Sequence, residues 1–555
     1  MADTTPDPSG TDPFAAMLEA QARWTQMMFA PLTQPSTAGE DAAPLPMADL
    51  QKWAENATRL QTMWLEFCQT NAIEATSEMM AGDPAEWPAK WFAMFETWTE
   101  QLPFADPAEQ QRWWAESAQL WQALLVPPGD SQDAAGGDAE LPREDRRFAD
   151  PRWREQPIFA LIHQTYLLLT ERVLAMVEKM DTIEPAKREQ LKFATQAMAE
   201  ALSPANFAAT NPIVLDRIME TRGESLVKGM QNLLQDLQKG QLTHSDPQAF
   251  TVGEDIAATP GQVVFETPLY QLIQYEPTTE KVLSVPLVIF PPWINRFYIL
   301  DLNEKKSFVK WALDQGLTVF MVSWKSADAS MKDIVWDDYI AAQIEAIDHV
   351  RKRLRQPHVH AIGYCVAGTT LAATLALLAT RGEADKVKSA TFFTAQIDFT
   401  DAGDLLHFVD DQQIAAIQGL KRDGYLDGRF MAATFNLLRG NDLIWNYVVR
   451  NYLLGEDHTA FDLLHWNGDV TNLPAKWHRD YLQDLYRDNL LVKPGRLQAL
   501  GTPIDLRKVE VPTYVQAGKD DHIAPAASVW KITEHFRGPL RFVLAGSGHI
   551  AGVVN

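Results

Sequence analysis

The residue with the most specific chemistry in this sequence is Cys365, which lies between an apolar run and a helix-like stretch. The apolar run leads to Gly363, and small residues that favour a helix follow at 371–378. This pattern predicts a strand, a sharp turn and a helix, with the cysteine at the turn. A thiol at a helix N-terminus and near a histidine is a potential nucleophile, because both favour the thiolate. The alternative is an ordinary buried cysteine at a strand end, since free cysteine is among the most buried residue types.

The small residues around Cys365 match the nucleophile elbow of the α/β-hydrolase fold, G-x-S-x-G, with sulfur in place of the serine oxygen. The elbow needs small residues two positions before and two positions after the nucleophile, because strand and helix pack closely there. Gly363 and Ala367 fill these positions, and Gly368 follows. Ala367 is one methyl group larger than the usual glycine, so the match is good but imperfect.

Two further candidate residues follow downstream, each in a loop after a predicted strand. The β-like run 511–517 leads to the acidic turn 518–525, which contains Asp521. A second run, 540–545, leads to the glycine-rich loop 546–552, which contains His549. The order nucleophile, acid, histidine is that of the α/β hydrolases. The sequence therefore predicts a catalytic triad.

The chemistry of the three residue types assigns their roles. Cys365 would be the nucleophile, His549 its general base, and Asp521 the carboxylate that orients and stabilises the histidine. Asp520 competes with Asp521 for the acid position, because it is the adjacent residue in the same turn. A single Asp or His is usually a solvated loop residue. A cysteine, an aspartate and a histidine in the expected order, each directly after a predicted strand, are much less easily explained by chance.

Several longer segments make the sequence similar to the polyhydroxyalkanoate synthases, and most similar to the class I type. The likeness covers most of residues 150–555 and rests on these segments: Phe290–Asp301, Val322–Lys325, Gly363–Thr369, Gly424–Gly428, Asn441–Tyr447, Phe461–Asn467, Asp521–Ile523 and Gly548–Val553. The resemblance implies a polymerase that takes (R)-3-hydroxyacyl-CoA, extends a polyester and releases coenzyme A. It favours short acyl groups such as 3-hydroxybutyryl.

The sequence departs from this family at two points. Ala367 stands where many members have glycine, and the chain stops soon after His549 where members usually continue for some tens of residues. The second departure puts the packing near the active-site histidine in question.

Each acyl transfer passes through an oxyanion, which needs preorganised hydrogen-bond donors. The backbone N–H of Val366, directly after the nucleophile, is one expected donor. A second is expected from the loop 292–295, which follows the predicted strand 285–290, and Ile294 is our choice within it. The sequence thus predicts an oxyanion hole formed by Val366 and Ile294.

The connection between the strand near 389–399 and the strand at 511 is far longer than usual, so we interpret residues 400–505 as a lid over the site. Within it, Trp466 could line the acyl or polymer channel, or it could be an aromatic residue of the lid core. Arg439 could meet a coenzyme A phosphate, since a guanidinium suits bidentate phosphate contacts. The alternative for Arg439 is a surface salt bridge.

Composition excludes several other classes of protein. The formal net charge is -24 and the pI is about 4.9, which argues against nucleic acid and anionic lipid as partners. With two cysteines, Cys68 and Cys365, a disulfide framework is not expected and a reducing cytoplasm fits. The N-terminus does not read as a signal peptide, and no apolar run is long enough to span a membrane. No nucleotide-binding motif or zinc-ligand spacing occurs, so we expect neither a metal nor another cofactor.

Compositional shifts divide the chain into five regions, ending in an α/β catalytic domain with a mostly parallel sheet. These are a loose N-terminus at 1–46, a Trp-rich helical region at 47–125, a linker at 126–150, a helical domain at 151–261 and the catalytic domain at 262–555. Trp87, Trp91 and Trp98 fit one helical face. That face is either part of a small helical core or a surface for a hydrophobic polymer or a partner protein.

The resemblance implies a cytoplasmic enzyme at the surface of polyester granules, in contact with granule-coat proteins and forming a homodimer. Two other functions stay open. A thiol hydrolase of the dienelactone-hydrolase kind has the same triad but passes the acyl group to water. A non-catalytic granule-coat protein would use the Trp-rich helices alone, although an intact triad argues against it.

Overall fold

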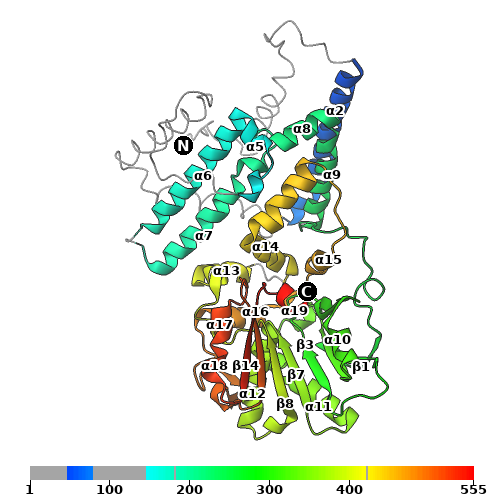
Figure 1. Ribbon diagram of the computed structural model, residues 1–555, viewed down its shortest axis with the longest axis vertical. Helices are drawn as coiled ribbons and strands as arrows, with labels where there is room; N and C mark the ends of the chain where they lie inside the picture. The colour runs from blue at the N-terminus through cyan, green and yellow to red at the C-terminus, as the bar shows by residue number, and fades with distance from the viewer. Residues whose placement is uncertain (1–46, 79–144, 181–182, 420–422, 555) are drawn as a thin grey trace, which may run out of the picture.

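An eight-stranded, mostly parallel sheet carries the C-terminal half of the protein in the computed structural model, which describes residues 47–78, 145–180, 183–419 and 423–554 (Figure 1). The strand order is β1-β2-β6-β3-β7-β8-β13-β14, and only the pairs β1–β2 and β2–β6 are antiparallel. The strands are β1 Gly261–Glu266, β2 Tyr270–Tyr275, β3 Leu287–Phe290, β6 Val319–Trp324, β7 Val359–Tyr364, β8 Val387–Phe393, β13 Thr513–Gly518 and β14 Leu540–Ala545. This is the predicted α/β-hydrolase architecture.

The central strands are buried on both faces, which is why they are continuous apolar runs and do not alternate with polar residues. Two hydrophobic clusters cover the two faces of the sheet. The helices around it are α10 Phe308–Asp314, α11 Trp336–Leu354, α12 Val366–Thr380, α17 Ala526–Trp530, α18 Ile532–His535 and α19 Ala551–Val554. Every residue of α12 from Val366 to Leu378 is buried, so this helix is enclosed by the protein on all sides.

The chain between β8 and β13 forms a cap of short elements. Its α-helices are α13 Asp411–Gly419, α14 Gly428–Leu438, α15 Asp462–Gly468 and α16 Ala475–Asp480. Three π-helical segments follow some of them: η8 Asn441–Trp445, η9 Val448–Leu453 and η10 Tyr481–Arg487. Two small sheets, β9 Tyr425–Leu426 with β10 Leu473–Pro474 and β11 Gln498–Ala499 with β12 Thr502–Pro503, complete it.

A group of N-terminal helices lies beyond the cap, on the side away from the sheet (Figure 1). They are α2 Met47–Glu78, α5 Arg152–Glu155, α6 Pro157–Glu178, α7 Pro185–Ala201, α8 Pro212–Thr221 and α9 Glu224–Lys239. Asn211 caps α8, because its side chain accepts hydrogen bonds from the N–H groups of Ile213 and Val214. The contact between this group and the rest of the protein is made chiefly by α9, which packs on η9.

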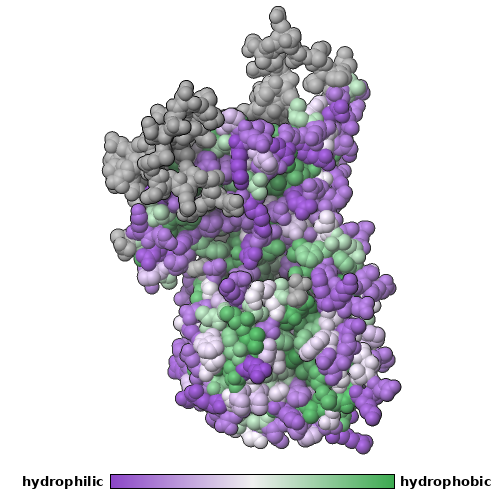
Figure 2. Space-filling view, in the orientation of Figure 1, coloured by the Kyte–Doolittle hydropathy of each residue, from purple (hydrophilic) through white to green (hydrophobic). Residues whose placement is uncertain are grey.

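The Trp-rich region is described only in part. Trp53 of α2 packs in a small cluster with Val214 and Ile218, and Trp64 stacks on Phe67. Residues 79–144, which contain the predicted face of Trp87, Trp91 and Trp98 and most of the predicted linker, lie outside the described residues; the last part of that linker, 145–150, includes a short helical turn at Arg146–Phe148 with Phe148 buried. Within the described part of the chain, no helix is both long enough and apolar enough to cross a membrane. Figure 2 shows hydrophilic residues over much of the N-terminal helices and hydrophobic residues gathered over parts of the sheet-containing half.

Candidate active site

Cys365 lies at the turn between β7 and α12, in a backbone conformation that is unusual for a residue other than glycine. Its φ is 53° and its ψ is -129°. The turn is fixed on both sides: the Cys365 N–H donates to the Phe393 carbonyl (3.0 Å), and its carbonyl accepts from the Gly368 N–H (2.9 Å). Such strain persists only where the surrounding structure imposes it. The result is a half-buried thiol presented at the N-terminus of α12.

The close approach of strand and helix at this turn depends on Gly363 and Gly368. A Cβ atom on Gly363 would lie 2.5 Å from the Gly368 Cα atom, and one on Gly368 would overlap the Ala395 side chain. Ala367, by contrast, is fully buried and fits beside these contacts. Gly368 thus makes a further close contact with β7, directly after the small residue that the elbow pattern places at position 367.

His549 and Asp521 form a buried pair. His549 Nδ1 lies 2.8 Å from Asp521 Oδ2, and the Asp521 side chain has no exposed surface. The other carboxylate oxygen, Oδ1, accepts the N–H groups of Ile523 and Ala524, both at 2.9 Å. Asp520 is exposed, and its N–H donates to Ser547. The structure thus places Asp521, and not Asp520, against the histidine.

His549 also hydrogen-bonds to Cys365, so the three predicted residues are brought together. Because Nδ1 donates to the carboxylate, Nε2 is the nitrogen left for the sulfur. Burial alone lowers the pKa of His549, but the negative charges of Asp521 and Cys365 and the hydrogen bonds to both raise it to about 10. The Tyr364 hydroxyl holds the loop from behind by donating to the His549 carbonyl at 3.0 Å.

The two predicted oxyanion donors lie at the ends of neighbouring strands. Val366 is the first residue of α12, whose N–H has no acceptor within the helix. Ile294 lies four residues after β3, and Phe290 at the end of β3 pairs with Gly363 of β7. Among the described residues, the Ile294 N–H has no hydrogen-bond acceptor in the protein. Both N–H groups are therefore available to a substrate.

Two tyrosines of the cap were not predicted from the sequence, yet both lie within the electrostatic reach of Cys365. Tyr481 and Tyr486 belong to the π-helix η10, and their ring centroids are 5.3 Å apart. The Tyr486 oxygen accepts hydrogen bonds from the Tyr481 hydroxyl and from Gln396 Nε2, the latter at 3.1 Å. Burial, and to a lesser extent charges that include Cys365, raises the pKa of both tyrosines, which keeps them protonated as donors.

The remaining two predicted residues take different positions. Trp466 is buried, and its Nε1 donates to the Arg296 carbonyl at 2.8 Å, so it packs against the loop that contains Ile294. The Arg439 guanidinium is about half exposed and pairs with Asp442 at 2.8 Å. Burial, followed by the charge of Arg439, lowers the pKa of His522, the residue after Asp521. Arg439 therefore lies near the active-site loop while keeping a salt bridge.

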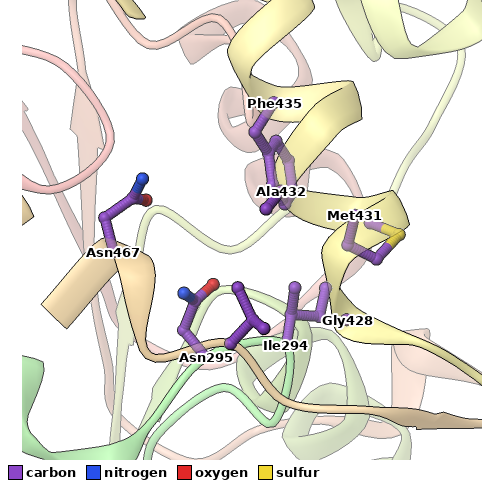
Figure 3. Close-up of a pocket in the computed structure, with 8 residues that line it drawn as sticks. Ile294, Asn295, Gly428, Met431, Ala432, Phe435 and Asn467 are labelled. Carbon is purple, nitrogen blue, oxygen red and sulfur yellow. The ribbon is translucent and has the colours of Figure 1, made fainter. Parts of the chain in front are cut away.

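A small cavity adjoins the oxyanion loop. Figure 3 shows Ile294 and Asn295 facing α14 of the cap across this space, with Asn467 at its side. Its lining consists of Ile294, Asn295, Gly428, Met431, Ala432, Phe435, Asn467 and Val470. The cavity is thus mostly apolar, with two side-chain amides.

Two family models match the chain. A model described as the N-terminus of poly-beta-hydroxybutyrate polymerase (PhaC) matches residues 144–312, and an alpha/beta hydrolase fold model matches residues 286–555. Among solved structures, a hydrolase from Pseudomonas aeruginosa is 15% identical with a TM-score of 0.30, covering 53% of this chain and 92% of its own. An enol-lactonase from Burkholderia xenovorans is 12% identical with a TM-score of 0.27, covering 51% and 91%.

Curated relatives are much more similar in sequence. The poly(3-hydroxyalkanoate) polymerase subunit PhaC of Rhizobium meliloti is 46% identical over 76% of this chain and 70% of its own length. The poly(3-hydroxyalkanoate) polymerase of Methylorubrum extorquens is 48% identical over 74% and 69%. The PhaC subunit of Cupriavidus necator is 43% identical over 80% and 75%.

Proposed function

This chain belongs to the poly(3-hydroxyalkanoate) polymerase family, and we propose that Cys365 is the residue that takes each acyl group from coenzyme A before it joins the polyester. The protein is an acyltransferase that makes polyester from CoA thioesters. The observation that supports our assignment of the site is the hydrogen-bonded set of Cys365, His549 and Asp521 at the end of β7.

In the first step, Cys365 exchanges one thioester for another. Because its pKa is raised to about 10, His549 already holds the proton given up by the thiol, and the Cys365 sulfur attacks the carbonyl carbon of the 3-hydroxyacyl-CoA. The bond between that carbon and the coenzyme A sulfur breaks, and the departing sulfur takes the proton back from His549 as free coenzyme A forms. The raised pKa of His549 suits this step, because the imidazolium is stabilised by Asp521 while it holds the proton.

In the second step, the acyl group moves from sulfur to oxygen. The terminal hydroxyl of the growing chain loses its proton to His549, and its oxygen attacks the acyl-cysteine carbonyl. The carbon–sulfur bond breaks, an ester bond forms, and the Cys365 sulfur recovers the proton. The chain is then one unit longer and again ends in a hydroxyl.

Sulfur at position 365 keeps the acyl group activated between the two steps. Transfer from one thioester to another changes the free energy little, whereas an oxygen ester on serine would be a poor donor to the next hydroxyl. The negative oxygen that develops in each step would be held by the N–H groups of Val366 and Ile294, which lie at the ends of neighbouring strands.

For the substrate, we propose short acyl groups, with (R)-3-hydroxybutyryl-CoA as the first to test. Arg439 lies near the active-site loop and is half exposed, which suits a contact with a coenzyme A phosphate if the Asp442 pair opens. Trp466 is buried against the oxyanion loop and would support the acyl site through that loop.

We further propose that the enzyme works at the surface of polyester granules in the cytoplasm, as a homodimer and in contact with granule-coat proteins through its N-terminal region. The support for this is the product itself, because an insoluble polyester places its growing end at a granule surface. No metal or other cofactor has a role in the proposed steps.

The experiment that tests this function measures coenzyme A release from (R)-3-hydroxybutyryl-CoA and weighs the polymer in the same samples. Wild type and the control Cys68→Ala should release coenzyme A and accumulate polymer. Cys365→Ala should lose at least about 10³-fold in turnover, because the covalent step is removed. Cys365→Ser should turn over at below about 1% of the wild-type rate, because its ester is a poor acyl donor.

Other outcomes would point elsewhere. Release of free 3-hydroxybutyrate without polymer would identify a thioesterase of the dienelactone-hydrolase kind. Full turnover by Cys365→Ala would remove Cys365 from the mechanism. Absence of turnover in wild type as well would reject the short-chain substrate.

A further inference from the structure

A short segment of the cap, residues 466–474, lies across the ends of β3 and β6; we refer to it as the strap. Asn295 pairs with Val470 in an antiparallel bridge, which joins the strap to the loop after β3. On the other side, the Ala327 N–H donates to the Asn472 carbonyl at 3.1 Å, and Asn472 Nδ2 donates to the Ala327 carbonyl at 3.1 Å. The strap is therefore fixed to the loops that follow two strands of the central sheet.

Thr471 of the strap makes the closest contact with the oxyanion loop. Its Oγ1 lies 2.6 Å from the carbonyl oxygen of Trp293 and 2.6 Å from that of Ile294, and the residue is 3% exposed. A threonine hydroxyl has one proton, so it donates to these two carbonyls in turn. The two oxygens thus enclose a single buried hydroxyl, and two successive peptide units are held from one side.

This contact constrains the predicted oxyanion donor directly. The Trp293 carbonyl and the Ile294 N–H belong to the same planar trans peptide unit, in which C=O and N–H point in opposite directions. A hydroxyl that holds the carbonyl therefore sets the direction of the N–H, which points away from Thr471. The Ile294 N–H has no acceptor among the described residues, as expected for a group kept for a ligand.

Thr471 is itself held in place by α14. A Cβ atom on Gly428, the first residue of α14, would overlap the Thr471 carbonyl oxygen. The Gly428 N–H donates to Asn472 Oδ1 at 3.0 Å. The same helix forms one wall of the cavity that Ile294 lines (Figure 3). The position of the hydroxyl therefore follows the position of the cap.

We propose that Thr471 is a positioning residue for acyl transfer: its hydroxyl holds the Trp293–Ile294 peptide so that the Ile294 N–H donates to the oxyanion. This inference rests on the proposed function, in which Ile294 is an oxyanion donor. In this proposal both parts of the protein form the oxyanion hole: the donors follow strands of the sheet, and the cap orients one of them through Thr471.

The test is to replace the Thr471 hydroxyl and to compare two reactions of Cys365. Thr471→Val keeps the shape and removes the hydroxyl, whereas Thr471→Ser keeps the hydroxyl and removes the methyl group. Turnover of (R)-3-hydroxybutyryl-CoA passes through an oxyanion. Alkylation of Cys365 by iodoacetamide does not, so it reports on the thiol alone. Thr513→Val is the matched control, because Thr513 is also buried and donates to a backbone carbonyl, but it lies at the N-terminal end of β13, whereas Thr471 contacts the loop after the C-terminal end of β3.

Removal of a complete oxyanion donor lowers kcat by about 10²–10³-fold, so misaligning one should cost less, about 10- to 100-fold. We expect that loss in kcat for Thr471→Val, with KM within about 3-fold and the alkylation rate unchanged. Thr471→Ser should retain turnover within about 3-fold of wild type, and Thr513→Val should match wild type.

Three results would overturn the proposal. One is wild-type turnover by Thr471→Val. Another is an equal loss of turnover and alkylation, which would show that Thr471 supports the whole elbow. The third is a Thr471→Ser variant that alkylates normally but has lost turnover, and this result decides the matter even if Thr471→Val does not fold. Cys365→Ala distinguishes a failure of the proposed function from a failure of the Thr471 proposal. If Cys365→Ala retains turnover, the proposed function is wrong. If Cys365→Ala is inactive while Thr471→Val has wild-type turnover, only the role of Thr471 is wrong.

Discussion

Cys365 occupies a backbone conformation that costs about 1–3 kcal/mol for a residue other than glycine. Glycine would adopt this conformation without that cost, so the presence of cysteine here indicates that its side chain is needed. The neighbouring residues supply the compensation, since the Gly363–Gly368 approach leaves room for a helix that starts directly beneath the sulfur. The strained backbone at Cys365 is thus a local sign of a functional site, and Gly363 and Gly368 allow the close packing of strand and helix that imposes it.

His549 provides a prediction for the pH dependence of stability. Its pKa is raised from 6.5 to about 10 in the folded protein, chiefly by Asp521 and Cys365 acting against burial. A raised pKa means that folding favours the protonated form, so this stabilisation is complete below about pH 6.5 and is lost as the pH rises through about 10. His549→Asn lacks it at every pH. The difference in free energy of unfolding between wild type and His549→Asn should therefore shrink from pH 6 to pH 10.

Urea-induced unfolding of both proteins at pH 6, 8 and 10 measures this difference. Asp521→Asn is the control, because it removes the largest contribution that raises the pKa of His549 and should flatten the pH dependence. A difference that stays constant or grows toward pH 10 would contradict the imidazolium form of His549.

At the scale of elements, α9 and the cap meet through backbone contacts that only glycine permits. A Cβ atom on Gly229 of α9 would overlap the Tyr452 carbonyl oxygen, and one on Gly455 would overlap the Ser225 carbonyl oxygen. The Tyr452 hydroxyl also donates to Asp236 of α9 at 2.6 Å. This interface joins residues more than two hundred positions apart in the sequence.

Gly229→Ala tests this interface with two opposing effects of known size. Alanine favours a helix over glycine by about 1 kcal/mol, whereas overpacking a fitted contact costs about 1–3 kcal/mol and occasionally more. Because the Cβ atom meets backbone, which cannot rotate away, we expect the free energy of unfolding to fall by about 1–2 kcal/mol. The control is Gly468→Ala, a helical glycine where a Cβ atom would meet nothing within 4 Å. An unchanged or higher stability of Gly229→Ala in urea unfolding would show that α9 is free to move.

The elements of the sheet were predictable from the sequence, and those of the cap were less so. The run 540–545 is β14 to the residue, and the strand expected at 511–517 is β13 Thr513–Gly518, because each is a short run rich in apolar residues that ends at a turn. The strand expected near 389–399 ends earlier, at Phe393. Tyr481 and Tyr486 were missed because a residue spacing of five is not a helical period. It brings two side chains together only in a π-helix such as η10.

For the whole molecule, the order of the triad residues was predictable and the arrangement of the layers was not. Each of Cys365, Asp521 and His549 follows its own strand, so local patterns locate all three. Two contacts could not be predicted: the packing of α9 on η9, and the contact of Thr471 with the loop after β3. Each joins two segments that are far apart in the sequence, and the residue pattern of one segment does not indicate which other segment it packs against. The predicted lid was placed by the length of the connection alone, and its helices could be located only approximately.

The net charge of -24 leads to a prediction about substrate binding. Coenzyme A thioesters carry several negative charges, so the field of the whole protein repels them. The screening length falls from about 30 Å at 0.01 M salt to about 8 Å at 0.15 M, which weakens long-range repulsion but leaves short contacts in place. The KM for (R)-3-hydroxybutyryl-CoA should therefore fall about 2- to 5-fold over this range of sodium chloride, with kcat unchanged.

The control substrate is the 3-hydroxybutyryl thioester of pantetheine, which lacks the phosphates and should show no dependence of KM on salt. The opposite result, a KM for the CoA substrate that rises with salt, would mean that local cations outweigh the global charge. Arg439 is then the residue to test, because it is half exposed and near the active-site loop. Arg439→Gln would abolish the rise if its guanidinium leaves Asp442 for a phosphate. It would leave the rise intact if the pair with Asp442 is permanent.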